Sequence, residues 1–267
     1  MAEPILEAHE VSKRYPQRGG LFRAHHGVIT AVDRVSCSLG VGETLGLVGE
    51  SGSGKSTLAK LLVGLVTPTA GDVRIQGQPL GQLRGAALLQ ARRTVQFVFQ
   101  DPTNSLNPRM TVEEILSEPL IIHRQASGAS RRNRIIELLT SVQLPETYRT
   151  RLPHELSGGE RQRVGIARAL AIQPHALICD EPIASLDVSV GAQLLTLLRS
   201  LVRRYRMALL FISHDLRAVA SLCDRITVMQ HGRLVEFGST EQILTHPTHP
   251  YTELLLHCAR LDLDATE

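Results

Sequence analysis

One nine-residue stretch constrains this chain more than any other feature: GESGSGKST, at residues 49–57. It matches the pattern G-x-x-x-x-G-K-[ST], follows an apolar run at residues 44–48, and precedes a segment with helical spacing at residues 58–65. Glycines let such a loop curl until successive N–H groups point at phosphate oxygens, and the following helix adds its positive N-terminal end. The sequence therefore predicts a strand–loop–helix unit that binds phosphate.

This phosphate loop assigns a role to its polar residues. We expect Lys55 to reach the β- and γ-phosphates of a nucleotide, and the Ser56 hydroxyl to ligate Mg²⁺. A Gly-Ser linker is the alternative interpretation, but the flanking strand and helix patterns argue against it. The candidate nucleotide-binding residues are Gly49, Glu50, Ser51, Gly52, Ser53, Gly54, Lys55, Ser56 and Thr57.

A second motif is the acidic pair Asp180-Glu181, which follows an apolar run at residues 176–179. A strand there would deliver both carboxylates to the edge of a sheet where α/β folds bind ligands. We expect Asp180 to support Mg²⁺ and Glu181 to polarise an attacking water. Such a pair alone is more often a helix cap or a solvated loop; combined with the phosphate loop, it predicts a P-loop NTPase.

The rest of the chain alternates short apolar runs with helical spacing, which predicts an α/β fold with a mostly parallel sheet. Ahead of the phosphate loop, two runs predict strands of an N-terminal antiparallel β region. Near the other end, His231-Gly232 predicts a hairpin turn. The predicted strands lie at residues 28–32, 35–39, 44–48, 73–76, 95–99, 176–179, 209–212, 226–230 and 233–237.

Residues 101–156 differ from this pattern, being poor in strands and divided by prolines. Ile135, Leu138, Leu139 and Val142 fall on one face of an amphipathic helix. We therefore expect a single domain over residues 1–257 with a helical insert at about 101–156, followed by a short tail at 258–267. The punctuating prolines are Pro102, Pro108, Pro119, Pro145 and Pro153.

Composition excludes several classes of protein. The net charge of +3 is too mild to argue for nucleic acid. No apolar run approaches the roughly 20 residues of a membrane helix, and the N-terminal segment lacks the order of a signal peptide, so we expect a cytosolic chain. Four cysteines without CxxC spacing favour buried thiols over a metal or disulfide framework. His246 and His249 each lie beside a proline, which favours a packed turn over a metal site.

A third motif narrows the prediction. Residues 156–162 read LSGGERQ and open a helical segment. They resemble the LSGGQ signature of the ABC ATPase family, with Glu160 in the glutamine position. A helix start with glycines can form a second anion site. In the family, the signature residues face the γ-phosphate bound by the other subunit, and here these are Ser157, Gly158, Gly159 and Glu160.

The same resemblance assigns further roles. Gln100 is similar to the glutamine that contacts Mg²⁺ and water beside the permease, and His214 to the histidine that holds the γ-phosphate. A lone histidine at a strand end is usually structural, but its place after the acidic pair favours function. Residues 185–187 resemble the loop at the dimer interface, and Tyr15 the aromatic residue that stacks on adenine.

Three longer segments, at residues 99–116, 180–193 and 246–256, resemble the peptide and nickel importers within this family. The resemblance implies an ATP-hydrolysing subunit that powers uptake of di- or oligopeptides, or of nickel, free or chelated. It implies a second ABC ATPase, identical or related, two permease subunits and an extracytoplasmic binding protein. The chain would sit peripherally on the cytoplasmic face of the inner membrane. Its length is closer to nickel-type or shorter members.

Two other functions remain open. A soluble ABC protein acting on ribosomes or DNA would carry twin cassettes, CxxC pairs or long coiled coils, and the sequence has none of these, so we expect no nucleic-acid partner. A regulatory partner that binds ATP without hydrolysing it is the other. The presence of both Glu181 and His214 argues against that role.

Overall fold

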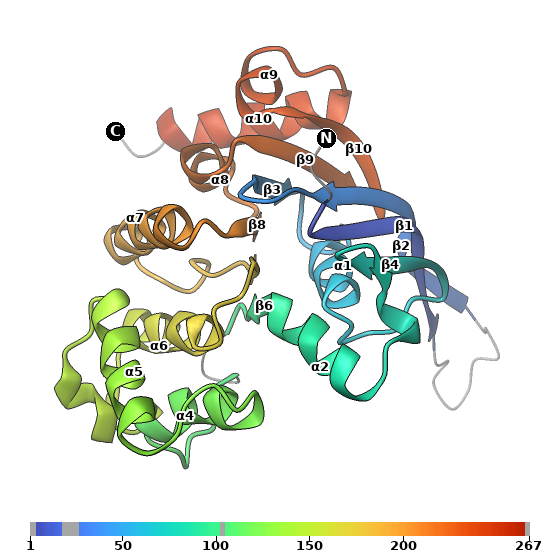
Figure 1. Cartoon of the computed structure of the whole chain (residues 1–267). Helices are drawn as coiled ribbons and strands as arrows, with labels where there is room; N and C mark the ends of the chain where they lie inside the picture. Colours follow the sequence, from blue (N-terminus) through green and yellow to red (C-terminus); the bar gives the residue numbers. More distant parts are fainter. Residues whose placement is uncertain (1–3, 18–26, 102–104, 265–267) are drawn as a thin grey trace, which may run out of the picture. The chain divides into compact units, whose positions relative to one another are not determined.

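The computed structural model describes residues 4–17, 27–101 and 105–264. It divides the chain into two compact units (Figure 1). The first unit contains residues 1–83 and 210–267, and the second contains residues 84–209. These units do not test the predicted single domain over residues 1–257 or its tail at 258–267, which stay predictions.

The first unit contains an antiparallel sheet in the order β2-β1-β4-β5, so the predicted N-terminal antiparallel region is confirmed. The two strands predicted at residues 28–32 and 35–39 form one strand, because an irregular register with a positive φ at Arg34 bends β2 without ending it. The strands are β1 (Leu6–Gln17), β2 (Gly27–Leu39), β4 (Ala70–Ile75) and β5 (Gln78–Pro79).

The same unit carries a second set of strands in the order β10-β9-β3-β8. β3 pairs parallel with β9, and β9 pairs antiparallel with β10 through the predicted His231-Gly232 turn, where φ is 46° and 80°. All five residues of β3 are buried. The bounds are β3 (Thr44–Val48), β8 (Ala208–Ile212), β9 (Arg225–Gln230) and β10 (Arg233–Ser239), with the unit boundary inside β8.

Helix α1 packs its apolar side, including Leu58 and Leu62, into the core of the first unit. It begins three residues earlier than the sequence indicated, directly at Lys55, because the phosphate loop itself supplies the helix start. The helices of this unit are α1 (Lys55–Leu62), η1 (Leu80–Gln82), α8 (Leu216–Leu222), α9 (Thr240–Thr245) and α10 (Pro250–Asp264).

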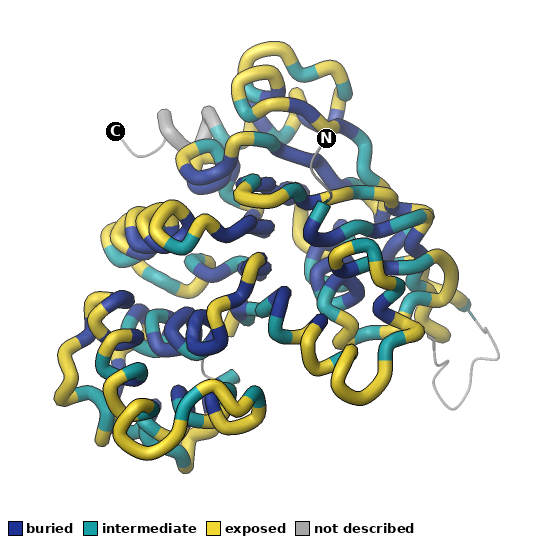
Figure 2. Tube along the Cα trace, in the orientation of Figure 1, coloured by how far each residue is buried: buried dark blue, intermediate teal, exposed yellow. Residues whose placement is uncertain are grey.

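In the second unit, β6 and β7 pair parallel. Helix α6 is its most deeply buried helix, dark blue over most of its length in Figure 2. The elements are α2 (Gly85–Thr94), β6 (Val95–Val98), α4 (Val112–Ile122), α5 (Gly128–Ser141), η2 (Glu146–Thr150), η3 (Pro153–Glu155), α6 (Gly158–Leu170), β7 (Ala176–Asp180) and α7 (Val188–Tyr205).

Within residues 105–156 every described regular element is helical, as the sequence indicated, and α4, α5 and α6 pack together (Figure 1). The predicted apolar face at Ile135, Leu138, Leu139 and Val142 is buried. Pro119 does not divide this region, however, since it lies inside α4. Proline keeps a helical φ and loses one hydrogen bond. Burial of the flanking Ile115 and Leu120 offsets that loss.

Across the described residues, no helix is both long and apolar enough to cross a membrane. Cys179 and Cys223 are buried, as expected, and Cys37 is half-buried. Cys258 is exposed on α10, which differs from the expectation of buried thiols.

Candidate active site

The phosphate loop joins β3 to α1 in the first unit and is shaped by its own backbone. Gly54 precedes α1 with a φ of 110°, and a Cβ there would overlap the carbonyl of Ala31, so no larger residue fits. The N–H of Ser53 donates to the Glu50 carbonyl at 3.2 Å, and that of Leu58 donates to the Gly54 carbonyl at 2.9 Å. The loop therefore curls tightly onto the start of α1.

Lys55 is folded into this loop and is only 4% exposed. Its Nζ donates to the Gly49 carbonyl at 2.6 Å and to the Glu50 carbonyl at 2.8 Å. A buried ammonium requires such acceptors, and charged phosphate oxygens would be stronger ones. The buried Ser53 hydroxyl has no hydrogen-bond partner among the described residues. The buried ammonium and the Ser53 hydroxyl are both features expected of a loop that binds a phosphate ligand.

His214 lies in the same unit as the loop, directly after β8. The preceding Ser213 donates its N–H to the Leu47 carbonyl of β3 at 3.2 Å, which ties this segment to the strand that leads into the phosphate loop. The following Asp215 caps α8 by accepting from two backbone N–H groups. His214 therefore lies at the strand end between two residues whose positions are fixed by hydrogen bonds, and its side chain is exposed.

Tyr15, the residue assigned to adenine stacking, lies in β1 of the first unit. Its side chain is partly exposed, and Lys13 Nζ lies 5.2 Å from the centre of its ring. Most of the segment that follows it, residues 18–26, lies outside the described residues. Its role stays a prediction.

In the second unit, the ends of β6 and β7 bring two predicted catalytic residues together. Gln100 follows β6, Glu181 follows β7, and Gln100 Nε2 donates to Glu181 Oε2 at 3.1 Å. Glu181 adopts a φ of 45°, an uncommon conformation for a residue other than glycine that costs on the order of 1 kcal/mol. Asp180, just before it, is 3% exposed. Both carboxylates are therefore held at this strand end.

The signature residues form the start of α6. The Ser157 side chain accepts from the N–H of Glu160 at 3.3 Å, while Glu160 Oε2 accepts from the N–H of Ser157 at 2.8 Å, a reciprocal capping box. A Cβ on Gly159 would lie 2.6 Å from Val190 Cγ1 of α7, so this helix start packs too closely for a side chain. The Gly158 and Gly159 amides therefore lie at a rigid helix N-terminus, a feature that suits an anion.

Tyr148 contributes to this motif although no sequence pattern indicated its role. Its hydroxyl donates to Glu160 Oε1 at 2.5 Å. This hydrogen bond, ahead of the bonds from Ser157, holds the pKa of Glu160 below its ordinary value, because it favours the ionised carboxylate. Both carboxylate oxygens of Glu160 therefore accept hydrogen bonds that stabilise the local structure of the signature.

Gln162 is a second residue whose role the sequence did not indicate, although it belongs to the quoted motif. It is 1% exposed, and its Nε2 donates to the carbonyl of Phe99 at 3.4 Å. Phe99 immediately precedes Gln100, so this contact links the first turns of α6 to the segment that carries Gln100.

The predicted magnesium ligands are a hydroxyl, an amide and a carboxylate, from Ser56, Gln100 and Asp180. Oxygen donors of this kind suit Mg²⁺. Ser56 belongs to the first unit and the other two belong to the second, so their grouping around one ion stays a prediction. No cluster of three or more His, Cys, Asp or Glu side chains suited to a metal occurs in the part of the chain that the structure describes.

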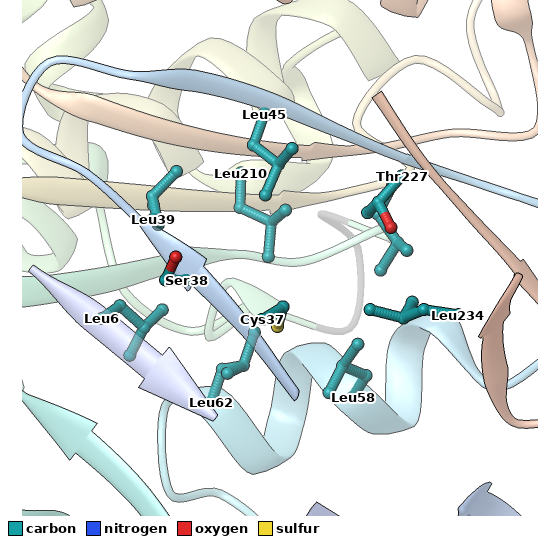
Figure 3. A pocket seen from close by; sticks show the side chains of 11 residues that line it. Leu6, Cys37, Ser38, Leu39, Leu45, Leu58, Leu62, Leu210, Thr227 and Leu234 are labelled. Atoms are coloured by element: carbon teal, nitrogen blue, oxygen red, sulfur yellow. The ribbon is translucent and has the colours of Figure 1, made fainter. Parts of the chain in front are cut away.

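A small apolar cavity of about 20 Å³ lies in the first unit between α1 and the sheets (Figure 3). Leu58 and Leu62 of α1 and Cys37 of β2 are among the residues that line it, and burial raises the pKa of the Cys37 thiol to about 12. A space of this size holds at most a single water. It is a packing feature beneath the phosphate-loop helix and is too small for a nucleotide.

Comparison with known proteins places these motifs in a family. A family model described as ABC transporter matches residues 32–184. The oligopeptide transport ATP-binding protein AppF of Bacillus subtilis is 45% identical over 255 residues, covering 95% of this chain and 78% of that protein. The dipeptide transport ATP-binding protein DppF of Escherichia coli is 44% identical over 256 residues, covering 96% and 76%.

Solved structures agree with this placement. A dimeric structure of a post-hydrolysis state of the ATP-binding cassette MJ0796, bound to ADP and Pi, has a TM-score of 0.78 and 32% identity. The match covers 88% of this chain and 98% of that one. Together with the phosphate loop, the acidic pair and the signature, these likenesses show that the chain belongs to the ABC transporter family as one of its ATP-binding cassettes.

Proposed function

We propose that this chain hydrolyses ATP to power the import of di- or oligopeptides. The observation that carries hydrolysis is the hydrogen bond between Gln100 and Glu181, which positions a carboxylate beside the buried Asp180. A regulatory subunit without catalysis would not need such an arrangement. The two relatives are named as oligopeptide and dipeptide transport ATP-binding proteins, and these names support a peptide cargo.

In this proposal the phosphate loop binds the nucleotide through its backbone N–H groups and Lys55, while His214 holds the γ-phosphate. Glu181 accepts a proton from the attacking water, and the Gln100 amide orients its carboxylate. Tyr15 stacks on adenine. Bound Mg²⁺, held by Ser56, Gln100 and Asp180, would neutralise charge on the phosphates.

A second ATPase subunit, identical or related, would complete each site. Ser157 and the glycines beside it lie at the N-terminus of α6, where backbone amides favour an anion. We infer that they face the γ-phosphate bound by the partner. The dimeric state of the MJ0796 cassette supports this arrangement.

The proposed partners in the membrane are two permease subunits, which work with an extracytoplasmic binding protein while this chain stays peripheral on the cytoplasmic face. We place the permease contact within residues 100–123, a segment with several apolar residues. Leu106 and Leu120 of that segment are buried and belong to the core, whereas Ile121 and Ile122 of α4 are each 53% exposed. These two isoleucines are the better candidates to receive a permease helix.

The experiment is reconstitution of the chain with its permeases in lipid vesicles. Binding protein loaded with a dipeptide or oligopeptide should stimulate ATP hydrolysis several-fold and drive peptide into the vesicle. Binding protein loaded with nickel or a nickel chelate serves as the competing arm. Stimulation by nickel alone would overturn the peptide assignment, and no hydrolysis in either arm would overturn the ATPase assignment.

A further inference from the structure

The phosphate loop has a hydrogen-bond partner far along the chain. The backbone N–H of Glu50 donates to the hydroxyl oxygen of Tyr251 at 2.9 Å. Both residues belong to the first unit, although 201 positions separate them. Tyr251 stands at the start of α10 and is 7% exposed, so its ring is held by packing. The loop is thus braced from outside the segment that forms it.

This contact acts on one peptide group from one side while Lys55 acts on it from the other. The peptide between Gly49 and Glu50 presents its N–H to Tyr251 and its carbonyl to Lys55 Nζ, at 2.6 Å. Because a peptide is planar, fixing the direction of the N–H also fixes the direction of the carbonyl. Tyr251 therefore determines where the loop presents the carbonyl that receives the lysine.

The position of Tyr251 is set in turn by a buried carboxylate. Glu236 of β10 is 9% exposed and accepts hydrogen bonds from a turn that we define as residues 246–252, the C-terminal turn. Its Oε1 accepts from the N–H and hydroxyl of Thr248 at 2.7 and 2.9 Å, and its Oε2 accepts from the N–H of His249 at 3.1 Å. The turn that carries Tyr251 is thus fastened to the sheet.

A further hydrogen bond within the C-terminal turn orients Tyr251 itself. His249 Nδ1 also accepts from the N–H of Tyr251 at 3.2 Å. A continuous path therefore runs from Glu236 through His249 and Tyr251 to Glu50 of the phosphate loop. We propose that Tyr251 is a positioning residue of the nucleotide site, one that presets the phosphate loop for ATP, and that Glu236 holds it in place.

This inference rests on the proposed nucleotide binding and predicts a particular kinetic pattern. Without the hydroxyl, the peptide after Gly49 is held only through its carbonyl, by Lys55, so more of the ordering of the loop must occur when the ligand binds. Tyr251→Phe should therefore weaken ADP and ATP binding roughly 5- to 10-fold, the size of one lost hydrogen bond. It should raise KM for ATP while leaving kcat within about twofold, because loss of uniform binding changes KM alone.

The test is calorimetric titration of the full chain with ADP, together with thermal unfolding of each variant. Tyr205→Phe, on α7 in the second unit, is the matched control and should change neither quantity. A purely structural Tyr251 would lower the unfolding temperature and leave the dissociation constant of ADP unchanged, and that result would overturn the inference. Failure of the unchanged chain to bind ADP would instead overturn the proposed function.

A double-mutant cycle tests the path through Glu236, and its Glu236→Gln single variant tests that path by itself if Tyr251→Phe folds poorly. Glu236→Gln keeps one acceptor oxygen and replaces the other with a donor, so it should weaken ADP binding about 2- to 3-fold. In the Tyr251→Phe background, Glu236→Gln should cause little further loss of ADP affinity, since the hydrogen bond from Glu50 to Tyr251 is already absent. Additive losses, or no loss from Glu236→Gln alone, would contradict the proposed path.

Discussion

Tyr148 and Glu160 are joined by a hydrogen bond of 2.5 Å, donated by the tyrosine hydroxyl to Oε1 of the carboxylate. The other carboxylate oxygen accepts from the backbone of Ser157. A glutamine, which the resemblance to LSGGQ would place here, has one acceptor oxygen where glutamate has two. The glutamate therefore accepts from the tyrosine and from the helix start at once.

The first prediction concerns this hydrogen bond. Tyr148→Phe should lower the free energy of unfolding by about 1 kcal/mol at pH 7, because a partly exposed bond to a charged group is lost. Urea denaturation would measure it. Tyr205→Phe is the control and should stay within about 0.5 kcal/mol of the unchanged chain. An equal loss in both variants would show that the Glu160 contact contributes nothing.

The second prediction is the pH dependence of that loss. The hydrogen bond from Tyr148 lowers the pKa of Glu160 from its ordinary value of 4.5. A depressed folded pKa adds stability that is complete above the ordinary value and is lost as the pH falls through the folded pKa. The difference between Tyr148→Phe and the unchanged chain should therefore be constant from pH 7 to about pH 5.5 and shrink towards pH 3.5. A difference that grows on acidification would contradict this.

Gly159 supplies the third prediction. A Cβ at this position would lie 2.6 Å from Val190 Cγ1, so Gly159→Ala should lower the free energy of unfolding by about 1–3 kcal/mol through overpacking. Val190→Ala in the same chain should recover most of that loss by removing the opposing methyl groups. Chemical denaturation of the two single variants and the double variant gives the result. Without recovery, the crowding would not arise from Val190.

Local patterns predicted much of this architecture. The apolar run at residues 44–48 and the glycines after it became β3 and the phosphate loop, since neighbours in the sequence determine both. β1 was not predicted. Its alternation of Leu6 and Ala8 breaks at Glu10, where a φ of 47° and a shift in register restart it at Val11. An inserted residue in a β-bulge changes the period that sequence analysis relies on.

Among the site residues, sequence motifs identified some, and others depend on contacts between distant parts of the chain. Gln100 and Glu181 were identified by motif, and parallel pairing of β6 with β7 brings them together. Tyr148 and Tyr251 were not assigned, because their roles depend on partners that only the folded chain provides. Glu50, the partner of Tyr251, lies 201 positions away, and no periodicity in the sequence links the two.

The fourth prediction addresses catalysis. Glu181→Gln should lower kcat for ATP at least about 100-fold, because an amide cannot accept the proton of the attacking water. The dissociation constant of ADP should change less than about twofold, since this side chain is not expected to bind the phosphates. Glu137→Gln on α5, a change of the same kind at an exposed carboxylate, should leave both quantities unchanged. Hydrolysis within a few-fold of the unchanged chain would exclude Glu181 as the base.

The fifth prediction tests the permease contact. Ile121 and Ile122 are each 53% exposed at the end of α4 and lie outside the buried core, so replacing both with serine should change the unfolding free energy by no more than about 1 kcal/mol. Basal hydrolysis by the isolated chain should persist. In the reconstituted complex, peptide-stimulated hydrolysis and uptake should both fall, because the apolar surface that receives the permease helix is lost.

Val188→Ser, at another exposed apolar residue on α7, is the comparison variant. The resemblance places the residues just before Val188 at the ATPase dimer interface, so this change should weaken dimerisation without weakening binding to the permease. Cysteines at positions 121 and 122 should crosslink to the permease subunits. Crosslinks to the second ATPase alone, or full peptide stimulation in the double serine variant, would mean that the permease docks elsewhere on this chain.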